Sequence, residues 1–250
     1  MAYIFVGIGV VFLILFLISR DKNGSIISTG LKTLASVMFV ITALVATVTT
    51  NALNNVAFIL IIIGLIFGMI GDILLDLKVY FKSLYNTYNV DIKNHDLLMY
   101  LGMLSFGIGH IMYIISTYML SNSLWLYLLI SLVSGLVLIS LIMVISIKVL
   151  KMNYGKFFIP AIAYGFLLSG FVIFMIFRIV DHYSTGNLLL LIGSISFILS
   201  DLVLSMTYFS KDEDYKKEGM LNPESRLMIS VNHVLYYGAQ FLIALSILLI

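Results

Sequence analysis

The stretch Ile70-Gly71-Asp72-Ile73-Leu74-Leu75-Asp76 closes an apolar run that begins at Val56. The run has the roughly 20 residues that an α-helix needs to cross a bilayer, so Asp72 is expected inside a membrane-spanning helix. A charged residue at the centre of such a helix costs about 2.5 to 3.5 kcal/mol on insertion scales, and such residues usually face a bundle interior or a wet cavity. Asp72 is therefore the first candidate for a functional residue, and Gly71 is expected to let a neighbouring helix approach.

The composition indicates an integral membrane protein. Of 250 residues, 62% are hydrophobic and 10% are charged, against roughly 25% charged in a typical soluble domain. The net charge of +2, with no basic tract, gives no indication of a nucleic-acid partner. The sequence has no cysteine, which excludes disulfides, Cys-ligated metals and thiol nucleophiles.

Eight apolar runs have or approach the length of a membrane span: about 2–19, 31–50, 56–77, 97–119, 124–147, 157–180, 187–207 and 227–250. Because the backbone in lipid must satisfy its own hydrogen bonds, all eight are predicted to be helices. The first run lacks a basic n-region and a cleavage site, which indicates a retained helix. Before the last run, Asn222 is predicted as an N-cap with Pro223 at the first helical position. The sequence thus predicts an all-α membrane protein, a single eight-helix transmembrane domain over residues 1–250.

Basic residues are distributed unequally between the loops. The odd-numbered loops, with the helix ends beside them, hold all but one of the 14 Lys and Arg residues, the exception being Arg178. The positive-inside rule therefore places the odd-numbered loops in the cytoplasm and both termini outside. The expected location is a bacterial cytoplasmic membrane, and the oligomeric state is unknown.

This orientation places a second acid, Asp201, at the depth of Asp72. Each lies about 15 residues from the outer start of its helix, which is about 22 Å along a span of about 30 Å. Further polar residues fall in the same half of the bilayer or near its middle: Lys32, Asn232, His233 and Gln240.

Both halves of the chain contain a glycine eight residues before the acid and a His-x-x-Tyr after it. These are Gly64, Asp72 and His110 to Tyr113 in the first half, and Gly193, Asp201 and His233 to Tyr236 in the second. Two four-helix halves in the same orientation would produce both sets. A weak 4+4 internal repeat is therefore a hypothesis.

Each candidate has a simpler structural interpretation. Asp72 and Asp201 could fasten helices by hydrogen bonds, and Asp76, one turn beyond Asp72, could lie at the interface. Lys32 could extend to lipid headgroups or provide a point charge for a phosphate. His110 could be a satisfied core histidine. No His has a second ligand at i+4, so no metal site is expected.

Four stretches carry a resemblance to a known family: Gly71-Asp72-Ile73-Leu74-Leu75; Phe106 through His110 to Tyr113; Gly193-Ser194-Ile195-Ser196-Phe197 with Ser200-Asp201; and Tyr236-Tyr237-Gly238-Ala239-Gln240-Phe241-Leu242-Ile243. With eight helices, they resemble the YhhN family of lysoplasmalogenase-like membrane proteins, from about Lys32 to Ile250. One departure is Thr33, which follows Lys32 where the family has proline.

The resemblance implies a hydrolase that cleaves the vinyl ether bond of a lysoplasmalogen. The products would be a fatty aldehyde and glycerophosphoethanolamine or glycerophosphocholine, with no cofactor and no metal. Asp72 and Asp201 fall on the family's acids and are the catalytic candidates. The candidates for binding the lysophospholipid are Lys32, Asp76, His110, Asn232, His233, Tyr236, Tyr237 and Gln240.

Vinyl ether hydrolysis begins with protonation of the β-carbon, and water then adds to the oxocarbenium ion. Two carboxyl groups suit this chemistry, one protonated as general acid and one ionised as base or cation stabiliser, as in glycosidases. The hypothesis is that one of Asp72 and Asp201 is the acid and the other orients water. The alternative is a proton-coupled transporter or lipid carrier in which the same acids form a proton relay.

Overall fold

Eight long helices make up the part of the chain that the computed structural model describes, which is residues 1–20, 25–88, 95–121, 125–211, 214, 219–220 and 222–250. Each is long and apolar enough to cross a membrane, and no strand occurs in these ranges. The predicted all-α bundle is therefore confirmed. The helices are α1 (Ala2–Ser19), α2 (Ile26–Thr49), α3 (Val56–Tyr88), α4 (His95–Met119), α5 (Trp125–Lys148), α6 (Phe158–Asp181), α7 (Thr185–Phe209) and α9 (Arg226–Ser246), with a short 3-10 helix η1 (Gly155–Phe157) before α6.

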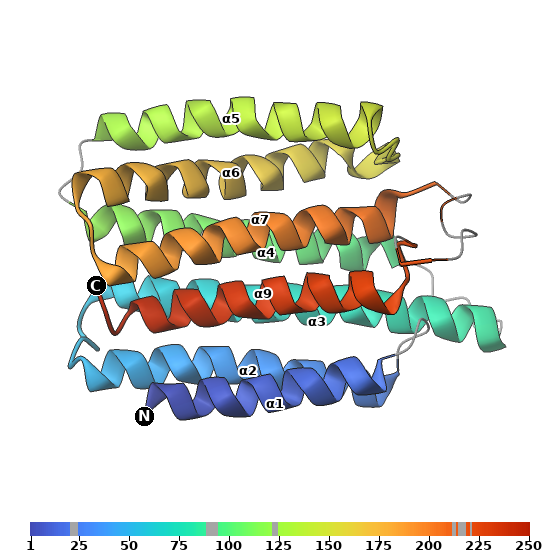
Figure 1. Cartoon of the computed structure of the whole chain (residues 1–250), viewed down its shortest axis with the longest axis horizontal. Helices are drawn as coiled ribbons and strands as arrows, with labels where there is room; N and C mark the ends of the chain where they lie inside the picture. Colours follow the sequence, from blue (N-terminus) through green and yellow to red (C-terminus); the bar gives the residue numbers. More distant parts are fainter. Residues whose placement is uncertain (21–24, 89–94, 122–124, 212–213, 215–218, 221) are drawn as a thin grey trace.

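The helices run side by side along the long axis of the molecule, and both termini lie at the same end (Figure 1). Helices α1 and α2 form one edge of the bundle and α5 and α6 the other, with α3, α4, α7 and α9 between them. This layout places α3 and α7, which carry the candidate acids, between the two edge pairs.

The two halves of the chain pack in the same order. Helix α1 packs on α2, α2 on α3 and α3 on α4, and likewise α5 packs on α6, α6 on α7 and α7 on α9. Between the halves, α2 contacts α9, and α6 makes the corresponding contact with α4. These shared neighbours agree with the 4+4 repeat that the sequence suggests.

Three helix boundaries differ from the sequence prediction. Helix α2 begins at Ile26 and not at 31, because Ser25 and Ser28 form a capping box there. Helix α3 continues to Tyr88, well past the predicted end at residue 77, because no proline or glycine interrupts the helix between residues 78 and 88. The predicted N-cap Asn222 is wrong: Ser225 caps α9 by accepting a hydrogen bond from Met228 N.

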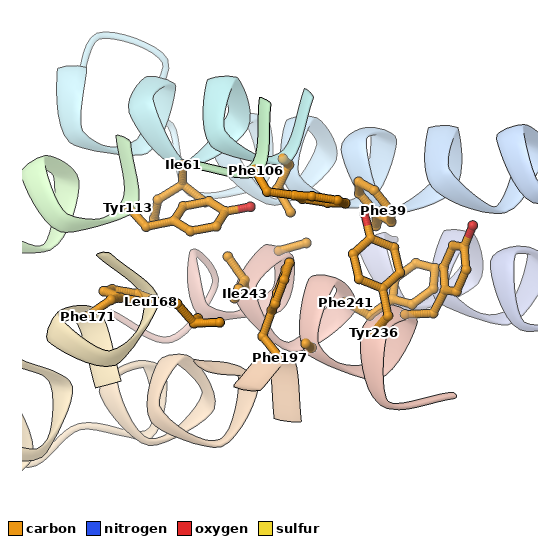
Figure 2. Close-up of a cluster of buried hydrophobic side chains, with 14 of the residues drawn as sticks. Phe39, Ile61, Phe106, Tyr113, Leu168, Phe171, Phe197, Tyr236, Phe241 and Ile243 are labelled. Atoms are coloured by element: carbon orange, nitrogen blue, oxygen red, sulfur yellow. The ribbon is translucent and has the colours of Figure 1, made fainter. Parts of the chain in front are cut away.

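Aromatic side chains fill the centre of the bundle (Figure 2). The rings of Phe106, Phe197 and Tyr236 form the aromatic cluster, with centroids 5.4 to 5.9 Å apart. They come from α4, α7 and α9, so this cluster joins the two halves. Gly71 allows the approach, as expected, because a Cβ there would lie 2.9 Å from Phe106 Cε2.

Candidate functional site

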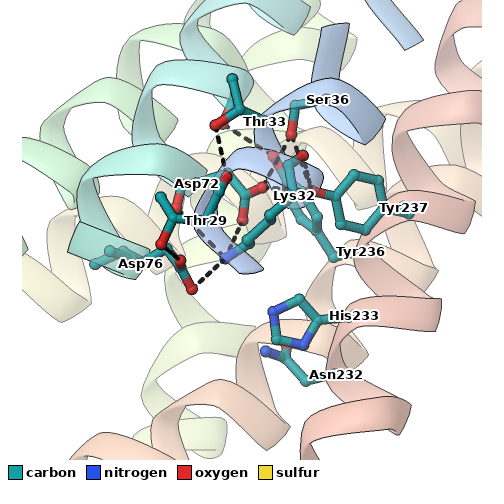
Figure 3. Close-up of polar contacts among 12 residues, drawn as sticks. Thr29, Lys32, Thr33, Ser36, Asp72, Asp76, Asn232, His233, Tyr236 and Tyr237 are labelled. Carbon is teal, nitrogen blue, oxygen red and sulfur yellow. Dashed lines mark hydrogen bonds and ion pairs between the residues drawn. The ribbon is translucent and has the colours of Figure 1, made fainter. Parts of the chain in front are cut away.

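Two carboxyl groups one turn apart on α3 meet two cations from the neighbouring helices. Lys32 Nζ, from α2, lies 2.8 Å from Asp72 Oδ1 and 3.6 Å from Asp76 Oδ1 (Figure 3). Arg20 Nη1, at the end of α1, lies 3.0 Å from Asp76 Oδ1. All four residues are buried. This charged cluster (Arg20, Lys32, Asp72 and Asp76) holds two positive and two negative groups and is neutral overall.

Hydroxyl groups occupy the remaining carboxylate oxygens of the charged cluster. Thr29 donates to Asp76 Oδ2. Ser36 donates to Asp72 Oδ2 at 3.0 Å, and the Tyr237 hydroxyl lies 2.8 Å from the same oxygen. Each of the four carboxylate oxygens thus has a partner, which is the condition under which buried ion pairs are tolerated. Lys32, which the sequence suggested as a contact for lipid headgroups or a phosphate, is therefore an internal ion-pair partner and does not reach the bundle surface.

Asp201 lies in very different surroundings. Its carboxyl accepts a hydrogen bond from the Tyr164 hydroxyl of α6 and lines a cavity of about 110 Å³ between α4, α5, α6 and α7. The walls are mostly aliphatic and aromatic, and Asp201 is the one charged side chain among the lining residues. We call this space the Asp201 cavity.

The structure does not bring Asp72 and Asp201 together at one cavity. Asp72 is not among the residues that line the Asp201 cavity. The aromatic cluster lies between them: Phe106 lines the cavity, and its ring contacts Tyr236, whose own ring is 5.1 Å from that of Tyr237 beside Asp72. A mechanism that needs both carboxyls at the same substrate atoms does not fit this arrangement.

The hydrogen-bond partners of the two acids agree with the hypothesis of a 4+4 repeat. Each accepts a hydrogen bond from a hydroxyl on the preceding helix: Ser36 is 36 residues before Asp72, and Tyr164 is 37 residues before Asp201. The two acids therefore occupy corresponding positions in the two halves. Only the first-half acid has a cation within ion-pair distance among the described residues.

Two of the predicted residues on α9 lie beside the charged cluster, as Figure 3 shows for His233 and Asn232. His233 Nδ1 donates to the carbonyl of Ile229 at 2.7 Å. Asn232 Oδ1 accepts from the hydroxyl of Ser200 at 2.8 Å. Since Ser200 precedes Asp201, this bond ties α9 to the segment of α7 that carries the second acid.

A chain of hydrogen bonds joins the other predicted polar residues of α9 to α3 and α4. The Tyr113 hydroxyl donates to Gln240 Oε1 at 3.1 Å, and Gln240 Nε2 donates to the Tyr236 hydroxyl at 3.1 Å. Tyr236 in turn donates to the carbonyl of Gly68 at 2.9 Å. The chain is fully buried and fixes Tyr236 within the aromatic cluster.

His110 lies apart from both acids, enclosed by aromatic rings. Its Nδ1 donates to the Phe106 carbonyl at 2.8 Å, and its ring packs edge-on against Phe197 and Tyr164. Its Nε2 is buried and has no hydrogen-bond partner among the described residues. His110 is therefore a core residue, but only one of its two ring nitrogens is satisfied, in contrast to the fully satisfied histidine that the sequence suggests.

Sequence reasoning missed Arg20, Thr29, Ser36 and Tyr164 as parts of the site. Arg20 was counted only as a loop charge, and hydroxyl residues are common in membrane helices. The nearly equal spacing of Ser36 to Asp72 and of Tyr164 to Asp201 is the signal that could have identified two of them. No group of three His, Asp or Glu residues in the described ranges could hold a metal ion.

The fold and site define a multi-pass membrane protein with one buried acid in a charge network and another on an apolar cavity. The sequence matches the model of the YhhN family over residues 27–247, and the chain belongs to this family, as the four motifs predicted. The family includes lysoplasmalogenase-like members. No curated protein and no solved structure matches the chain.

Proposed function

We propose that this protein is a lysoplasmalogenase-like hydrolase that cleaves the vinyl ether bond of a lysophospholipid at the Asp201 cavity. Family membership supports the class of reaction. The observation that carries the assignment is a carboxyl group, oriented by a tyrosine hydroxyl, on an otherwise uncharged cavity. An alkenyl chain can bury its double bond there next to an acid.

Asp201 is the general acid in this proposal. Lys, Arg and His are absent from the lining of its cavity, and an unpaired carboxylate in apolar surroundings is costly, so the group keeps its proton. Tyr164 donates to Oδ2 of Asp201, which leaves Oδ1 to carry the proton toward the substrate. This division of roles between the two oxygens fixes the direction of proton transfer.

The reaction then needs one carboxyl and one water molecule. Asp201 protonates the β-carbon of the vinyl ether, which leaves an oxocarbenium ion beside the new carboxylate. Water adds to the carbon that bears the ether oxygen and gives its proton back to Asp201. The hemiacetal collapses to an aldehyde and the glycerol hydroxyl, so the acid acts in both steps, as in retaining glycosidases.

Asp72 has a positioning role in this proposal. Its ion pair and hydrogen bonds join α2, α3 and α9, and α9 carries Tyr236 of the aromatic cluster that packs against the cavity wall at Phe106. The charged cluster therefore holds in place the helices that support the cavity.

The test is aldehyde release by the purified protein from a lysoplasmalogen, with the saturated-ether analogue as the blank. Asp201→Asn is expected to abolish release, since an amide cannot donate the catalytic proton. Tyr164→Phe is expected to lower the rate about 10- to 100-fold, because a hydrogen bond to a carboxylate contributes about 1.5 to 3 kcal/mol. Tyr127→Phe is the matched control, because Tyr127 stacks on Phe177 and does not line the cavity.

Two results would count against this proposal. If the wild-type protein releases no aldehyde, the proposed hydrolase activity is refuted. If Asp201→Asn releases aldehyde at the wild-type rate, the assignment of Asp201 as the acid is refuted. Substrate flux into proteoliposomes without bond cleavage would instead favour the transporter or lipid carrier, in which Asp72 and Asp201 would form a proton relay.

A further inference from the structure

The Asp201 cavity ends beside a lysine that neither the family motifs nor the proposed chemistry uses. Tyr208 and Met99 line the cavity. Lys78 Nζ lies 4.7 Å from the centroid of the Tyr208 ring and 2.8 Å from Met99 Sδ. A cation therefore lies directly at one boundary of the cavity, in contact with two of its walls.

The cation and the acid are aligned along the same wall. Asp201 and Tyr208 are seven residues apart on α7, which is nearly two turns, so both face the cavity about 10 Å apart along the helix. On α3, Leu75 lines the cavity and Lys78 follows one turn later on the same face. Asp201 thus lies at one point of the cavity wall, and the ammonium of Lys78 lies beside the part of the wall formed by Tyr208.

The rise of about 10 Å between Asp201 and Tyr208 is comparable to the distance between the reacting double bond and the phosphate of a lysophospholipid. Seven bonds separate the phosphorus from the β-carbon of the vinyl ether, and an extended chain of that length spans roughly 9 Å. The phosphodiester carries one negative charge, which a lysine ammonium can bind as a charge-assisted hydrogen bond. An extended lipid with its double bond at Asp201 therefore presents its phosphate to Lys78.

We propose that Lys78 binds the phosphate of the lysophospholipid whose vinyl ether lies at Asp201. This head-group site rests on the proposed function, because the register of the lipid is set by the reacting bond. It replaces Lys32 in the phosphate role that the sequence suggested, since Lys32 Nζ lies 2.8 Å from Asp72 inside the charged cluster and does not line the cavity.

The test measures binding without cleavage. Native mass spectrometry would count binding of a saturated-ether lysophosphoethanolamine, which cannot be hydrolysed as a vinyl ether, and of a monoalkylglycerol of the same chain length, which has no phosphate. The variants are Lys78→Met, which keeps an unbranched apolar stem, and Lys78→Arg, which keeps the charge. Lys148→Met is the control, because Lys148 is an exposed cation in the last turn of α5 and does not line the cavity.

Lys78→Met is expected to weaken binding of the phospholipid about tenfold or more, the typical effect of losing a charge-assisted hydrogen bond. Binding of the monoalkylglycerol is expected to stay unchanged, and Lys78→Arg and Lys148→Met should match wild type with both lipids. Inorganic phosphate should not compete at millimolar concentration, because the hydrocarbon chain of the lipid supplies most of the affinity. If phosphate does compete and also removes the preference for the phospholipid, Lys78 belongs to a site for free anions and the proposal is overturned.

Equal losses for both lipids in Lys78→Met, or no loss for the phospholipid, would also overturn it. So would a wild-type protein that binds both lipids equally well. These outcomes are independent of catalysis, because the saturated-ether lipid reports binding alone. If the protein binds the phosphate-bearing lipid through Lys78 but releases no aldehyde, the head-group site is supported and the proposed hydrolase activity is refuted.

Discussion

Replacing Asp72 with asparagine should destabilise the bundle through charge and not through shape. Asparagine has the same size and keeps an oxygen for Lys32, and its amide can still donate to the hydroxyl oxygens of Ser36 and Tyr237. What changes is the balance of the charged cluster, which goes from two cations and two anions to two cations and one anion. The only carboxylate left near Lys32 would be that of Asp76, 3.6 Å from Lys32 Nζ, and this carboxylate already pairs with Arg20 at 3.0 Å.

The expected size of this effect follows from burial. The side chains of Lys32 and Asp72 are 6% and 8% exposed, so water cannot replace the lost partner. Removing one member of a buried pair typically costs about 3 to 5 kcal/mol. Ser36→Ala, which leaves Tyr237 on the same carboxylate oxygen, should cost less, about 1.5 to 3 kcal/mol.

A double-mutant cycle isolates the charge contribution. Asp72→Asn and Lys32→Met each leave an unbalanced charge, whereas the combined variant is neutral again and retains the pair between Arg20 and Asp76. Unfolding in mixed micelles of increasing dodecyl sulfate content, followed by circular dichroism, gives the free energies. The double variant should lose about 3 kcal/mol less than the two single losses added together. Additive losses would refute the reasoning, because they would mean that Lys32 and Asp72 do not stabilise each other.

Two further predictions concern the helix contacts and the topology. Gly135→Ala should destabilise the bundle by about 1 to 3 kcal/mol in the same unfolding assay, because the new Cβ would lie 2.6 Å from the backbone nitrogen of Gly170. Gly30→Ala is the control: its Cβ would have open space, so this change should be neutral or stabilising. Since the chain has no cysteine, single cysteines report topology without background: Tyr183→Cys should react with an impermeant maleimide in intact cells and Asn153→Cys only after permeabilisation. The reverse pattern would contradict the inferred orientation.

The helices were predictable because a bilayer imposes a minimum length on any apolar run that crosses it. The run from Val56 is long enough to identify α3, and the depth of Asp72 follows from counting residues. Boundaries outside the apolar core were less predictable. The continuation of α3 to Tyr88 and the cap at Ser225 depend on local hydrogen bonding and not on hydropathy.

The separate surroundings of the two acids could not be predicted from the sequence. Depth along a helix is a single coordinate, and it leaves open which way the helix is rotated and which helices adjoin it. In runs as uniformly apolar as these, periodicity gives little information on rotation. Hence the sequence predicts one depth for Asp72 and Asp201, while the cations beside one and the cavity beside the other depend on tertiary contacts.

The shared packing order of the two halves has a consequence for how such a chain enters the membrane. A four-helix unit begins and ends on the same side of the bilayer, so a second copy joined to it inserts with the same polarity and needs no change in its loop charges. A unit with an odd number of helices would invert on duplication, as in many transporters. Under the proposed function, the acid of the first half keeps its ion pairs and secures the assembly, while the acid of the second half carries the reaction.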